Sequence, residues 1–335
     1  MSFTHHSISV HYAKALIAAA SRRGIDAQQL LRHAELNLNM VGKHTLRITP
    51  FQLSALMQHT WAALDDEFLG MSCDKSRFGV FAMMARQAAH QKTLRSVYYF
   101  SSRFYELITE AVQIRFTVNH EEARLSVMLP DTSSDPDGML RELLLLVWHR
   151  FPAWLIGKPI ALTHVGLEFS KPSHHLEHKL MFPCEIRYKQ AENYLAFKAS
   201  NLSNPVVQTT GNLKRYLRRA PLDWFQRQAY DSVFTRRVRE FLENEAYLNQ
   251  TDMEKIASRL HVTSRTLRRK LGEEGTSFQQ LKNEVRRDTA IQYLSLPKAP
   301  ISKISQRLGF SEPAAFSRAF KQWTGVSPSA YRFQG

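Results

Sequence analysis

Residues 251–271 read TDMEKIASRLHVTSRTLRRKL, and this stretch decides how the last third of the chain folds. Thr251, followed three residues later by Glu254, predicts the N-cap and capping box of a helix. The apolar residues of that helix share one face: Met253, Ile256, Ala257 and Leu260. Thr263 predicts the N-cap of a second helix, on which leucines repeat at a spacing of four residues. Two short helices joined by a tight turn are typical of a helix-turn-helix unit, whose second helix fits the major groove of DNA.

The exposed face of this second helix is strongly basic. It carries Arg265, Thr266, Arg268, Arg269 and Lys270. Arginine suits such a place because its guanidinium makes paired hydrogen bonds to guanine O6 and N7 and also binds phosphate. A basic face that only keeps the helix in water is the alternative, and the helix-turn-helix context argues against it.

Residues 299–332, APISKISQRLGFSEPAAFSRAFKQWTGVSPSAYR, repeat the pattern. Gly309 predicts the turn and Ser311 the N-cap of the next helix. The residues expected inside are Ile301, Ile304, Leu308, Phe316 and Phe320, and those expected outside are Glu312, Ser317, Arg318 and Lys321. Between the two units, residues 278–296 predict one long amphipathic helix. A rigid helix there would let both units enter successive major grooves, roughly 34 Å apart.

This tail resembles the DNA-binding domain of the AraC/XylS family of bacterial transcription regulators. The resemblance rests on IASRLHVTSRTLRRKL at 256–271 and on a spaced set further on: Ile301, Ile304, Gly309, Phe310, Phe316, Phe320 and Gly325-Val326-Ser327-Pro328. It covers about a hundred residues in order and without gaps. The resemblance implies an all-α DNA-binding domain with two helix-turn-helix units, which we place at residues 230–335.

The resemblance also implies which side chains contact DNA. Positions matching Arg265, Arg268 and Arg269 often reach the bases in this family, and Ser264 and Thr266 are expected on phosphate. The matching positions of the second unit are Glu312, Pro313, Ala314, Ser317 and Arg318. Pro313, Ala314 and the next residue, Ala315, offer no hydrogen-bonding side chain, although Ala314 suits contact with a thymine methyl group. We therefore expect the first unit to carry more sequence specificity, and Arg318 to be the main contact of the second.

Charge follows the same division. The chain of 335 residues has a formal net charge of +15, and residues 213–335 hold 23 Lys and Arg against 12 Asp and Glu. Basic residues thus concentrate where phosphate attraction requires them. Two cysteines, Cys73 and Cys184, suggest no disulfide framework. No secretion signal is visible, and the longest apolar run is too short to cross a bilayer, so we expect a cytoplasmic protein without membrane contact.

The first 200 residues predict an α+β domain. Three helical segments fill the first 65 residues, including one opened by Asp26 and one by Pro50. The later helices are expected at 93–111, 138–156 and 174–181, and the strands at 80–84, 112–118, 123–129, 162–169, 185–188 and 194–197. The two segments at 112–118 and 123–129 alternate around a polar turn and predict a hairpin. Residues 1–9 show no periodic pattern and predict a loose end.

Two long segments of this half also resemble a known domain. FLGMSCDKSRFGVFAMMARQAAHQKTLRSVYYFSSRFYEL at 68–107 and MFPCEIRYKQAENYLAF at 181–197 are similar to the N-terminal effector-binding domain of one AraC branch, which includes regulators of the ornithine-utilisation type. The resemblance implies a domain at residues 10–200 that binds a small-molecule effector and mediates self-association, with monomer and homodimer both left open by the sequence. A linker at 201–229 would follow. It further implies an activator that recruits RNA polymerase to promoter DNA, although a constitutive regulator whose first domain only dimerises stays open.

Candidate ligand and catalytic residues are fewer. Helices with Tyr98 to Tyr105 and Leu140 to Trp154 suit either an apolar effector pocket or a core, and no effector-binding residue is assigned. His174, His175 and His178 invite a metal site, but no acidic partner at a fixed spacing completes it, so a surface cluster without a metal is expected.

An enzymatic role is the remaining alternative. Pro183-Cys184 resembles the start of the reactive motif of alkyl-transfer repair proteins, but the histidine that would activate the thiol is missing. No Ser-His-Asp order, carboxylate pair or glycine-rich phosphate loop stands out. The sequence thus predicts a regulator that is not an enzyme and uses no cofactor.

Overall fold

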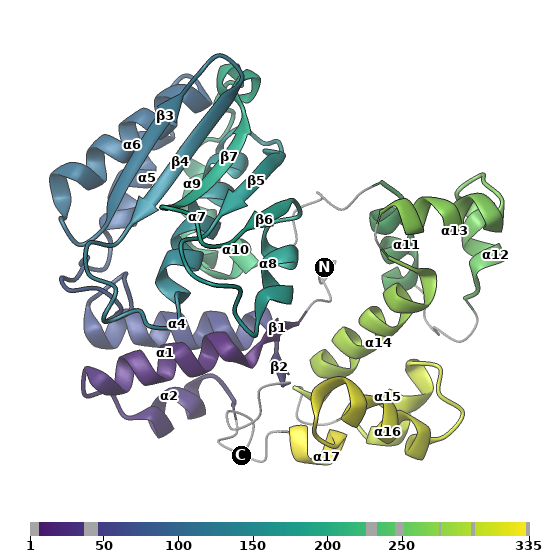
Figure 1. Cartoon of the computed structure of the whole chain (residues 1–335). Coiled ribbons are helices and arrows are strands. Elements are labelled where there is room, and N and C mark those ends of the chain that lie inside the picture. The colour runs from purple at the N-terminus through teal and green to yellow at the C-terminus, as the bar shows by residue number, and fades with distance from the viewer. Residues whose placement is uncertain are drawn as a thin grey trace. The chain divides into compact units, whose positions relative to one another are not determined.

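The computed structural model describes residues 7–36, 46–225, 233–244, 251–274, 276–295 and 299–332. They form two compact units (Figure 1). The first, here called the sheet unit, comprises His11–Ala34 and Leu53–Gln226. The second, here called the helical unit, comprises Met1–Val10, Glu35–Gln52 and Arg227–Gly335. Within the described ranges no helix is both long and apolar enough to cross a membrane.

A five-stranded sheet is the centre of the sheet unit. Its order is β3 (Gln113–Val118), β4 (Glu122–Met128), β7 (Asn193–Lys198), β5 (Leu162–Gly166) and β6 (Glu185–Arg187). All neighbours are antiparallel except β5 and β6, which are parallel. The predicted hairpin is confirmed, and Asn119 closes its turn by accepting hydrogen bonds from the backbone N–H groups of Glu121 and Glu122. The mixed sheet confirms the predicted α+β class.

Helices α6 (Leu94–Ile108) and α7 (Met139–Leu155) pack against this sheet. Figure 1 shows both running along it. Tyr98 of α6 is fully buried between Phe116 of β3 and Phe197 of β7, with ring centroids 4.9 and 5.4 Å apart. Nearly every residue of α7 is buried. This confirms that α7 lies at the centre of the unit, because a helix that is apolar on most faces is covered on most faces.

The remaining helices of the sheet unit surround this centre. They are α1 (Val10–Arg22), α2 (Ala27–His33), α4 (Pro50–Leu64), α5 (Val80–Ala88), α8 (His175–Met181), α9 (Thr210–Arg219) and α10 (Leu222–Phe225), with a 3₁₀ turn at Ala199–Ser203. Asp26 caps α2 as predicted, by accepting from the Gln28 N–H. Helices α9 and α10 contact α5 and α7 respectively. The domain boundary placed at residues 201–229 stays a prediction.

Two predictions for the N-terminal half are wrong. Residues 80–84 are not a strand but the start of α5, whose buried residues Met84, Ala85 and Ala88 follow helical spacing. A short apolar run does not distinguish a buried strand from a helix, and here Gly79, at φ +108°, starts the helix. Residues 7–9 are not a loose end, because β1 (Ile8–Ser9) pairs with β2 (Arg47–Ile48) and both Ser7 and Ile8 are buried.

The helical unit contains both predicted helix-turn-helix units. Helix α11 (Val233–Asn244) precedes them, and α12 (Met253–Arg259) and α13 (Ser264–Glu273) form the first. The long helix α14 (Phe278–Leu294) follows, then α15 (Ile301–Arg307) and α16 (Pro313–Thr324), and α17 (Pro328–Tyr331) closes the unit. Residues 226–232, between α10 and α11, lie outside the described residues.

The structure confirms some of the predicted helix starts and turns and corrects others. Thr263 caps α13 and Gly309 turns the chain at φ +76°, both as predicted. The cap of α12, however, is Asp252, which accepts from the Lys255 N–H, and Thr251 is buried just before it. The N-cap of α16 is Glu312 instead of Ser311, with Pro313 in the first turn. In both cases the next residue takes the cap. The predicted capping box of Thr251 and Glu254 is therefore also wrong, since the third residue after Asp252 is Lys255.

Candidate DNA-binding helices and ligand pocket

Helix α13 presents the predicted basic face. Arg265, Arg268 and Arg269 are exposed, while Ser264 and Thr266 are half-buried. Arg269 forms an ion pair with Glu273, with 2.7 Å between Nη1 and Oε1. Among the described residues, no carboxylate pairs with Arg265 or Arg268. These two guanidinium groups are therefore the ones available for an external anion or base edge.

Glu273 neutralises part of this face. It lies within 3.1 Å of Lys270 Nζ as well as close to Arg269. The hydrogen bond from Lys270, followed by the charge of Arg269, lowers the pKa of the Glu273 carboxyl. The sequence carried a signal for this pair, since Arg269 and Glu273 are four residues apart on one helix. The pair distinguishes Arg269 from the other two arginines.

The rest of the unit fixes the orientation of α13. Its inner face buries Leu267 and Leu271. At its end, the Glu274 carboxylate accepts hydrogen bonds from the backbone N–H groups of Phe234 and Thr235, at 3.2 and 2.7 Å, in the first turn of α11. A carboxylate at a helix N-terminus satisfies donors that have no partner within the helix. The recognition helix is thus held by both packing and polar contacts.

Helix α16 is the corresponding helix of the second unit. Glu312, Ala314 and Arg318 are exposed, and Ser317 is half-buried. The Ser317 hydroxyl already donates to the Pro313 carbonyl at 2.9 Å, so its proton is used within the helix. Arg318 has no ion-pair partner among the described residues. The helix therefore offers two exposed cations, Arg318 and Lys321, without an ion pair among the described residues, and a small apolar surface, as the sequence predicted.

A single arginine links α14 to the turn of the second unit. Arg286 donates from Nε to the Leu308 carbonyl at 2.9 Å, and its guanidinium lies 5.0 Å from the centroid of the Phe310 ring. This contact joins the long helix to the loop that precedes α16.

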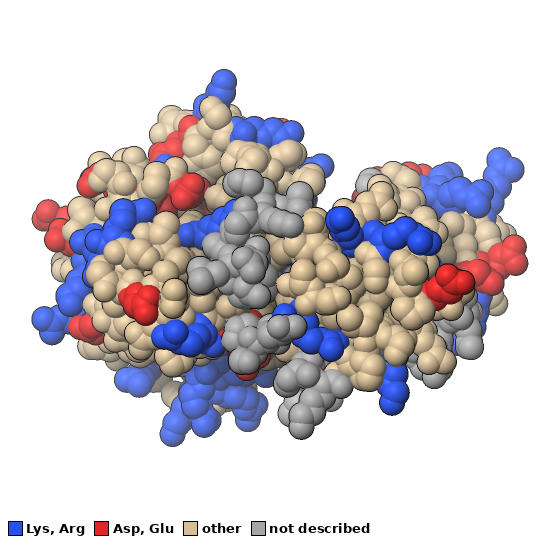
Figure 2. Space-filling view, turned by 90° about the horizontal axis from the view of Figure 1, so that it is seen from below, with Lys and Arg blue, Asp and Glu red and all other residues tan. Residues whose placement is uncertain are grey.

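On the face of the molecule shown in Figure 2, the surface of Lys and Arg is larger than that of Asp and Glu.

The sheet unit contains a pocket of about 400 Å³ with a largely apolar lining. Helix α7 contributes Leu140, Leu143, Leu144, Val147 and Trp148, and other elements contribute Trp61, Phe68, Phe78, Phe81, Ala82, Tyr105, Leu217 and Trp224. Its polar side chains are Gln58, Glu67 and Arg218. A concave, mostly apolar site with a few polar groups is the usual form of a small-molecule site.

The sequence left two helices open as either pocket lining or core. Helix α7 supplies five lining residues. Helix α6 supplies only Tyr105, and its Tyr98 is core. The pocket residues on α4, α5, α9 and α10 were not predicted, because their apolar residues have the same spacing as core residues.

Glu67 is the acidic group of the pocket. Its Oε1 and Oε2 accept from the backbone N–H groups of Gly79 and Phe81, each at 2.8 Å. Burial raises the pKa of Glu67 to about 7, despite the two hydrogen bonds that lower it. Burial also raises the pKa of the Tyr105 hydroxyl, and the charge of Glu67 adds to that effect. The pocket therefore holds a carboxyl group that titrates near neutral pH.

This titration gives a testable dependence of stability on pH. Folding raises the pKa of Glu67, so the stability that it contributes is present at low pH and is lost between about pH 4.5 and pH 7. Glu67→Gln lacks this titrating group. The free energy of unfolding of wild type minus that of the variant is therefore expected to fall by roughly 2 kcal/mol from pH 5 to pH 8. Thermal unfolding at both pH values measures it, with exposed Glu106→Gln as control. Parallel pH profiles for wild type and Glu67→Gln would contradict it.

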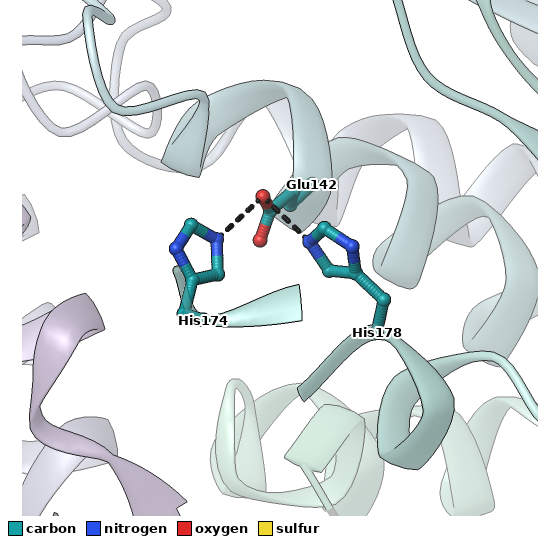
Figure 3. Close-up of side chains that lie close together, drawn as sticks. All are labelled: Glu142, His174 and His178. Atoms are coloured by element: carbon teal, nitrogen blue, oxygen red, sulfur yellow. Dashed lines mark hydrogen bonds and ion pairs between the residues drawn. The ribbon is translucent and has the colours of Figure 1, made fainter. Parts of the chain in front are cut away.

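The histidines of α8 do not form the expected surface cluster. His178 is fully buried and His174 nearly so, and both lie against the buried carboxylate of Glu142 on α7 (Figure 3). Each Nε2 is 2.9 Å from Glu142 Oε1. Burial alone would raise the pKa of Glu142, but the hydrogen bonds from His174 and His178 hold it at about 2. The acidic partner was missed because it lies more than thirty residues away in the sequence.

Cys184 has none of the features of a reactive thiol. It is half-buried, and burial together with the neighbouring Glu185 raises its pKa to about 12. A nucleophilic cysteine needs the opposite shift, toward the thiolate. These surroundings argue against the alkyl-transfer alternative.

Comparison with known proteins agrees with this architecture. Residues 24–206 match the arabinose-binding domain of AraC transcription regulators, N-terminal part, and residues 256–334 match a helix-turn-helix domain. Over 99% of its length, the chain is 24% identical to the ornithine utilization regulator of Pseudomonas aeruginosa, of which it covers 98%. It is also 39% identical to the urease operon transcriptional activator of Escherichia coli, over 24% of this chain and 28% of that one.

Among solved structures, the transcriptional regulator CdpR of Pseudomonas aeruginosa aligns with 97% of this chain and 98% of its own, at 18% identity and a TM-score of 0.34. The match to the arabinose-binding domain alone spans more than half of the chain, and the tandem helix-turn-helix units complete the architecture. The chain therefore belongs to the AraC family of DNA-binding transcription regulators.

Proposed function

We propose that the protein activates transcription from promoter DNA that it reads with α13 and α16, and that a small molecule in the pocket of the sheet unit controls this binding. The observation that carries the DNA-binding part is the exposed pair Arg265 and Arg268 on a recognition helix. We assign base contacts to these two residues, which have no carboxylate partner among the described residues.

The other candidate contacts have smaller roles. Ser264, Thr266 and Arg269 are assigned to phosphate, and Arg269 would have to exchange Glu273 for the DNA. In the second unit Arg318 is assigned to a base or phosphate, and Ala314 to a thymine methyl group. Glu312, the N-cap of α16, and Ser317 occupy the other matching positions and are the remaining candidate contacts, although the Ser317 hydroxyl already donates to the Pro313 carbonyl.

The lining of the pocket indicates the class of effector. A cavity of about 400 Å³ with aromatic walls suits a ligand with an apolar body. Glu67 and Tyr105 lie together there and suit one hydrogen-bond donor or cationic group on that ligand. The relative from Pseudomonas aeruginosa is named for ornithine utilization, so ornithine belongs in the ligand panel. The apolar walls lead us to expect tighter binding of an amine with a hydrocarbon or aromatic body.

Filling the pocket should separate effector control from DNA binding. Ala82 of α5 lines the pocket, and Ala82→Phe places a ring inside it. We expect the variant to bind promoter DNA as wild type does and to lose any shift caused by ligand. Melting temperature and DNA affinity, measured across a panel of amines, aromatic acids and ornithine, test this. Met83→Phe is the matched control, because Met83 is exposed on the same helix.

Two outcomes of this panel would reject the effector proposal. If no ligand shifts the melting temperature or DNA affinity of wild type, the first domain serves only self-association and the regulator is constitutive. If Ala82→Phe responds to a ligand as fully as wild type, the effector binds elsewhere. Recruitment of RNA polymerase and the homodimer are tested separately, by transcription from the promoter in vitro and by sedimentation.

A further inference from the structure

A buried carboxylate and two buried imidazoles meet inside the sheet unit. Glu142 of α7 and His178 of α8 are fully buried, and His174 is 9% exposed. Both Nε2 atoms point at one oxygen, Glu142 Oε1, at 2.9 Å (Figure 3). The other oxygen, Oε2, accepts a hydrogen bond from the Tyr12 hydroxyl at 2.7 Å. One carboxylate oxygen is thus held by Tyr12 while the other faces the two histidines.

We propose that Glu142, His174 and His178 form a binding site for a divalent transition metal ion, with Zn²⁺ as the best fit. The three ligand atoms lie within 4.8 Å of one another. Zinc binds imidazole nitrogen and carboxylate oxygen at roughly 2.0–2.2 Å, so its ligand atoms lie about 3.3–3.5 Å apart around it. The N···O distances of 2.9 Å would need to lengthen by only a few tenths of an ångström.

The local sequence places the two imidazoles together. His174 is the N-cap of α8, and His178 lies four residues later on the same helix. This spacing puts both side chains on the same side of a helix, facing α7. His175, between them, is turned elsewhere, since its Nδ1 is 3.0 Å from the Pro172 carbonyl. The neighbouring histidine therefore provides an internal control.

Groups around the three ligands fit a metal site. His178 Nδ1 is 3.0 Å from the Tyr188 hydroxyl, which is able to donate or accept. When Nε2 binds a metal it carries no proton, and Nδ1–H then donates to the Tyr188 hydroxyl, which fixes the tautomer and the orientation of the ring. The His11 ring stacks on His174 at 3.7 Å between centroids and restricts its rotation.

The ligand types select the metal. Imidazole nitrogen favours Zn²⁺, Co²⁺, Ni²⁺ or Cu²⁺, whereas Mg²⁺ and Ca²⁺ prefer oxygen ligands alone. Three protein ligands leave a fourth position for water or another small ligand. A bound ion would join α8 to α7 at Glu142. The next residue of α7, Leu143, lines the pocket. Without a metal, the same residues form a hydrogen-bonded clamp between these helices.

The test uses the full chain, stripped with a chelator and then titrated with ZnCl₂, CoCl₂ or MgCl₂. We expect one Zn²⁺ per chain by calorimetry, visible d–d absorption bands of four-coordinate Co²⁺, and no response to Mg²⁺. His178→Gln and Glu142→Gln should weaken Zn²⁺ binding by more than about 100-fold, because changes outside the ligand shell already cost 10–100-fold. His175→Gln should bind as wild type does, and Tyr188→Phe about 10-fold more weakly.

Two results overturn the proposal. One is a wild-type protein that binds no stoichiometric Zn²⁺ and gives no Co²⁺ bands, which leaves only the hydrogen-bonded clamp. The other is undiminished binding by His178→Gln, which places the metal on other histidines. If circular dichroism shows that His178→Gln does not fold, the wild-type Co²⁺ spectrum and the Zn²⁺ affinity of Tyr188→Phe decide whether the site binds a metal.

Discussion

Replacing Arg265 and Arg268 together by alanine is expected to weaken binding to the protein's own promoter DNA by roughly 100-fold or more. Each good paired contact between arginine and guanine is worth about 1–3 kcal/mol of discrimination. The fold should not change, because both side chains are exposed and no ion pair to either is seen among the described residues. Fluorescence anisotropy with a labelled promoter fragment and an unrelated fragment measures both affinity and specificity.

The controls for this prediction remove one positive charge, either in the sheet unit or at the paired arginine of α13. Arg103→Ala deletes one exposed arginine of the sheet unit and should leave binding unchanged. Arg269→Ala should cost less than either of the other arginines, because Arg269 is already paired with Glu273. A double variant that loses equal affinity for both fragments would mean that α13 contacts only phosphate. Unchanged affinity would mean that the recognition helix is misassigned.

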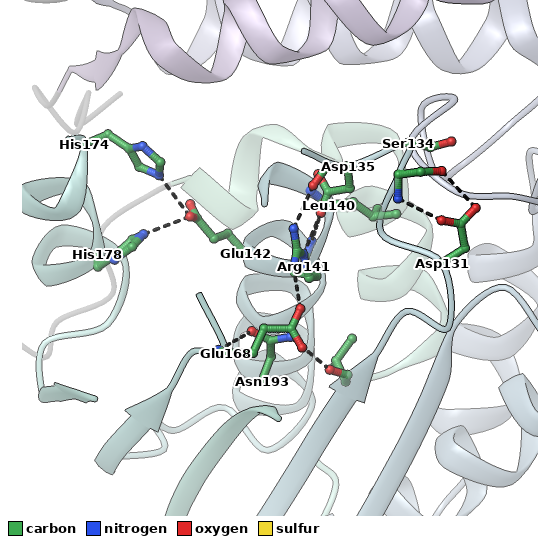
Figure 4. A network of polar contacts seen from close by, with 12 residues as sticks. Asp131, Ser134, Asp135, Leu140, Arg141, Glu142, Glu168, His174, His178 and Asn193 are labelled. Carbon is green, nitrogen blue, oxygen red and sulfur yellow. Dashed lines mark hydrogen bonds and ion pairs between the residues drawn. The ribbon is translucent and has the colours of Figure 1, made fainter. Parts of the chain in front are cut away.

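The second large effect is expected from Arg141→Ala, in the polar network shown in Figure 4. Arg141 Nε lies 3.0 Å from Asp135, whose side chain is 1% exposed, and Arg141 also pairs with Glu168. Removing one partner leaves an uncompensated buried carboxylate, which typically costs about 3–5 kcal/mol. Asp135 also accepts from the Leu140 N–H at the start of α7, so the loss should weaken the central helix.

The effect should depend on pH. Burial raises the pKa of Asp135, and the charge of Arg141 is among the contacts that lower it. Without Arg141 the pKa rises further, so the variant should lose more stability at pH 7 than at pH 5. Urea unfolding at both pH values measures this. Arg103→Ala is again the control, because it breaks an exposed pair with Glu106 that is worth at most about 1 kcal/mol. A similar loss in both variants would contradict the role of Arg141.

The helical unit was largely predictable from sequence because its signals are local. Caps, turns and four-residue spacing lie within a few residues of one another, as Thr263 and Gly309 show. The N-caps predicted at Thr251 and Ser311 are wrong because two adjacent polar residues are each able to cap a helix there, and the second of each pair does so. The exposed arginines of α13 were also placed correctly. The four-residue spacing of Arg269 and Glu273 also indicates their ion pair.

The sheet unit was harder because its important contacts connect distant residues. Glu142 meets His174 and His178 from another helix, and no spacing rule predicts such a meeting. The pocket likewise assembles from six helices and a loop, each of which looks like ordinary core by itself. The short apolar run at 80–84 fits strand and helix equally, and only its tertiary surroundings decide between them.

Hydroxyl-radical footprinting of the full-length protein on its own upstream DNA tests the central claim most directly. We predict two protected segments on one face of the duplex, about one helical turn apart, as two recognition helices in successive major grooves require. Arg265→Ala/Arg268→Ala should remove protection of one segment first, and Arg318→Ala should weaken the other. Protection of only a single segment, or uniform protection along the fragment at saturating protein, would contradict the reading of DNA by both α13 and α16.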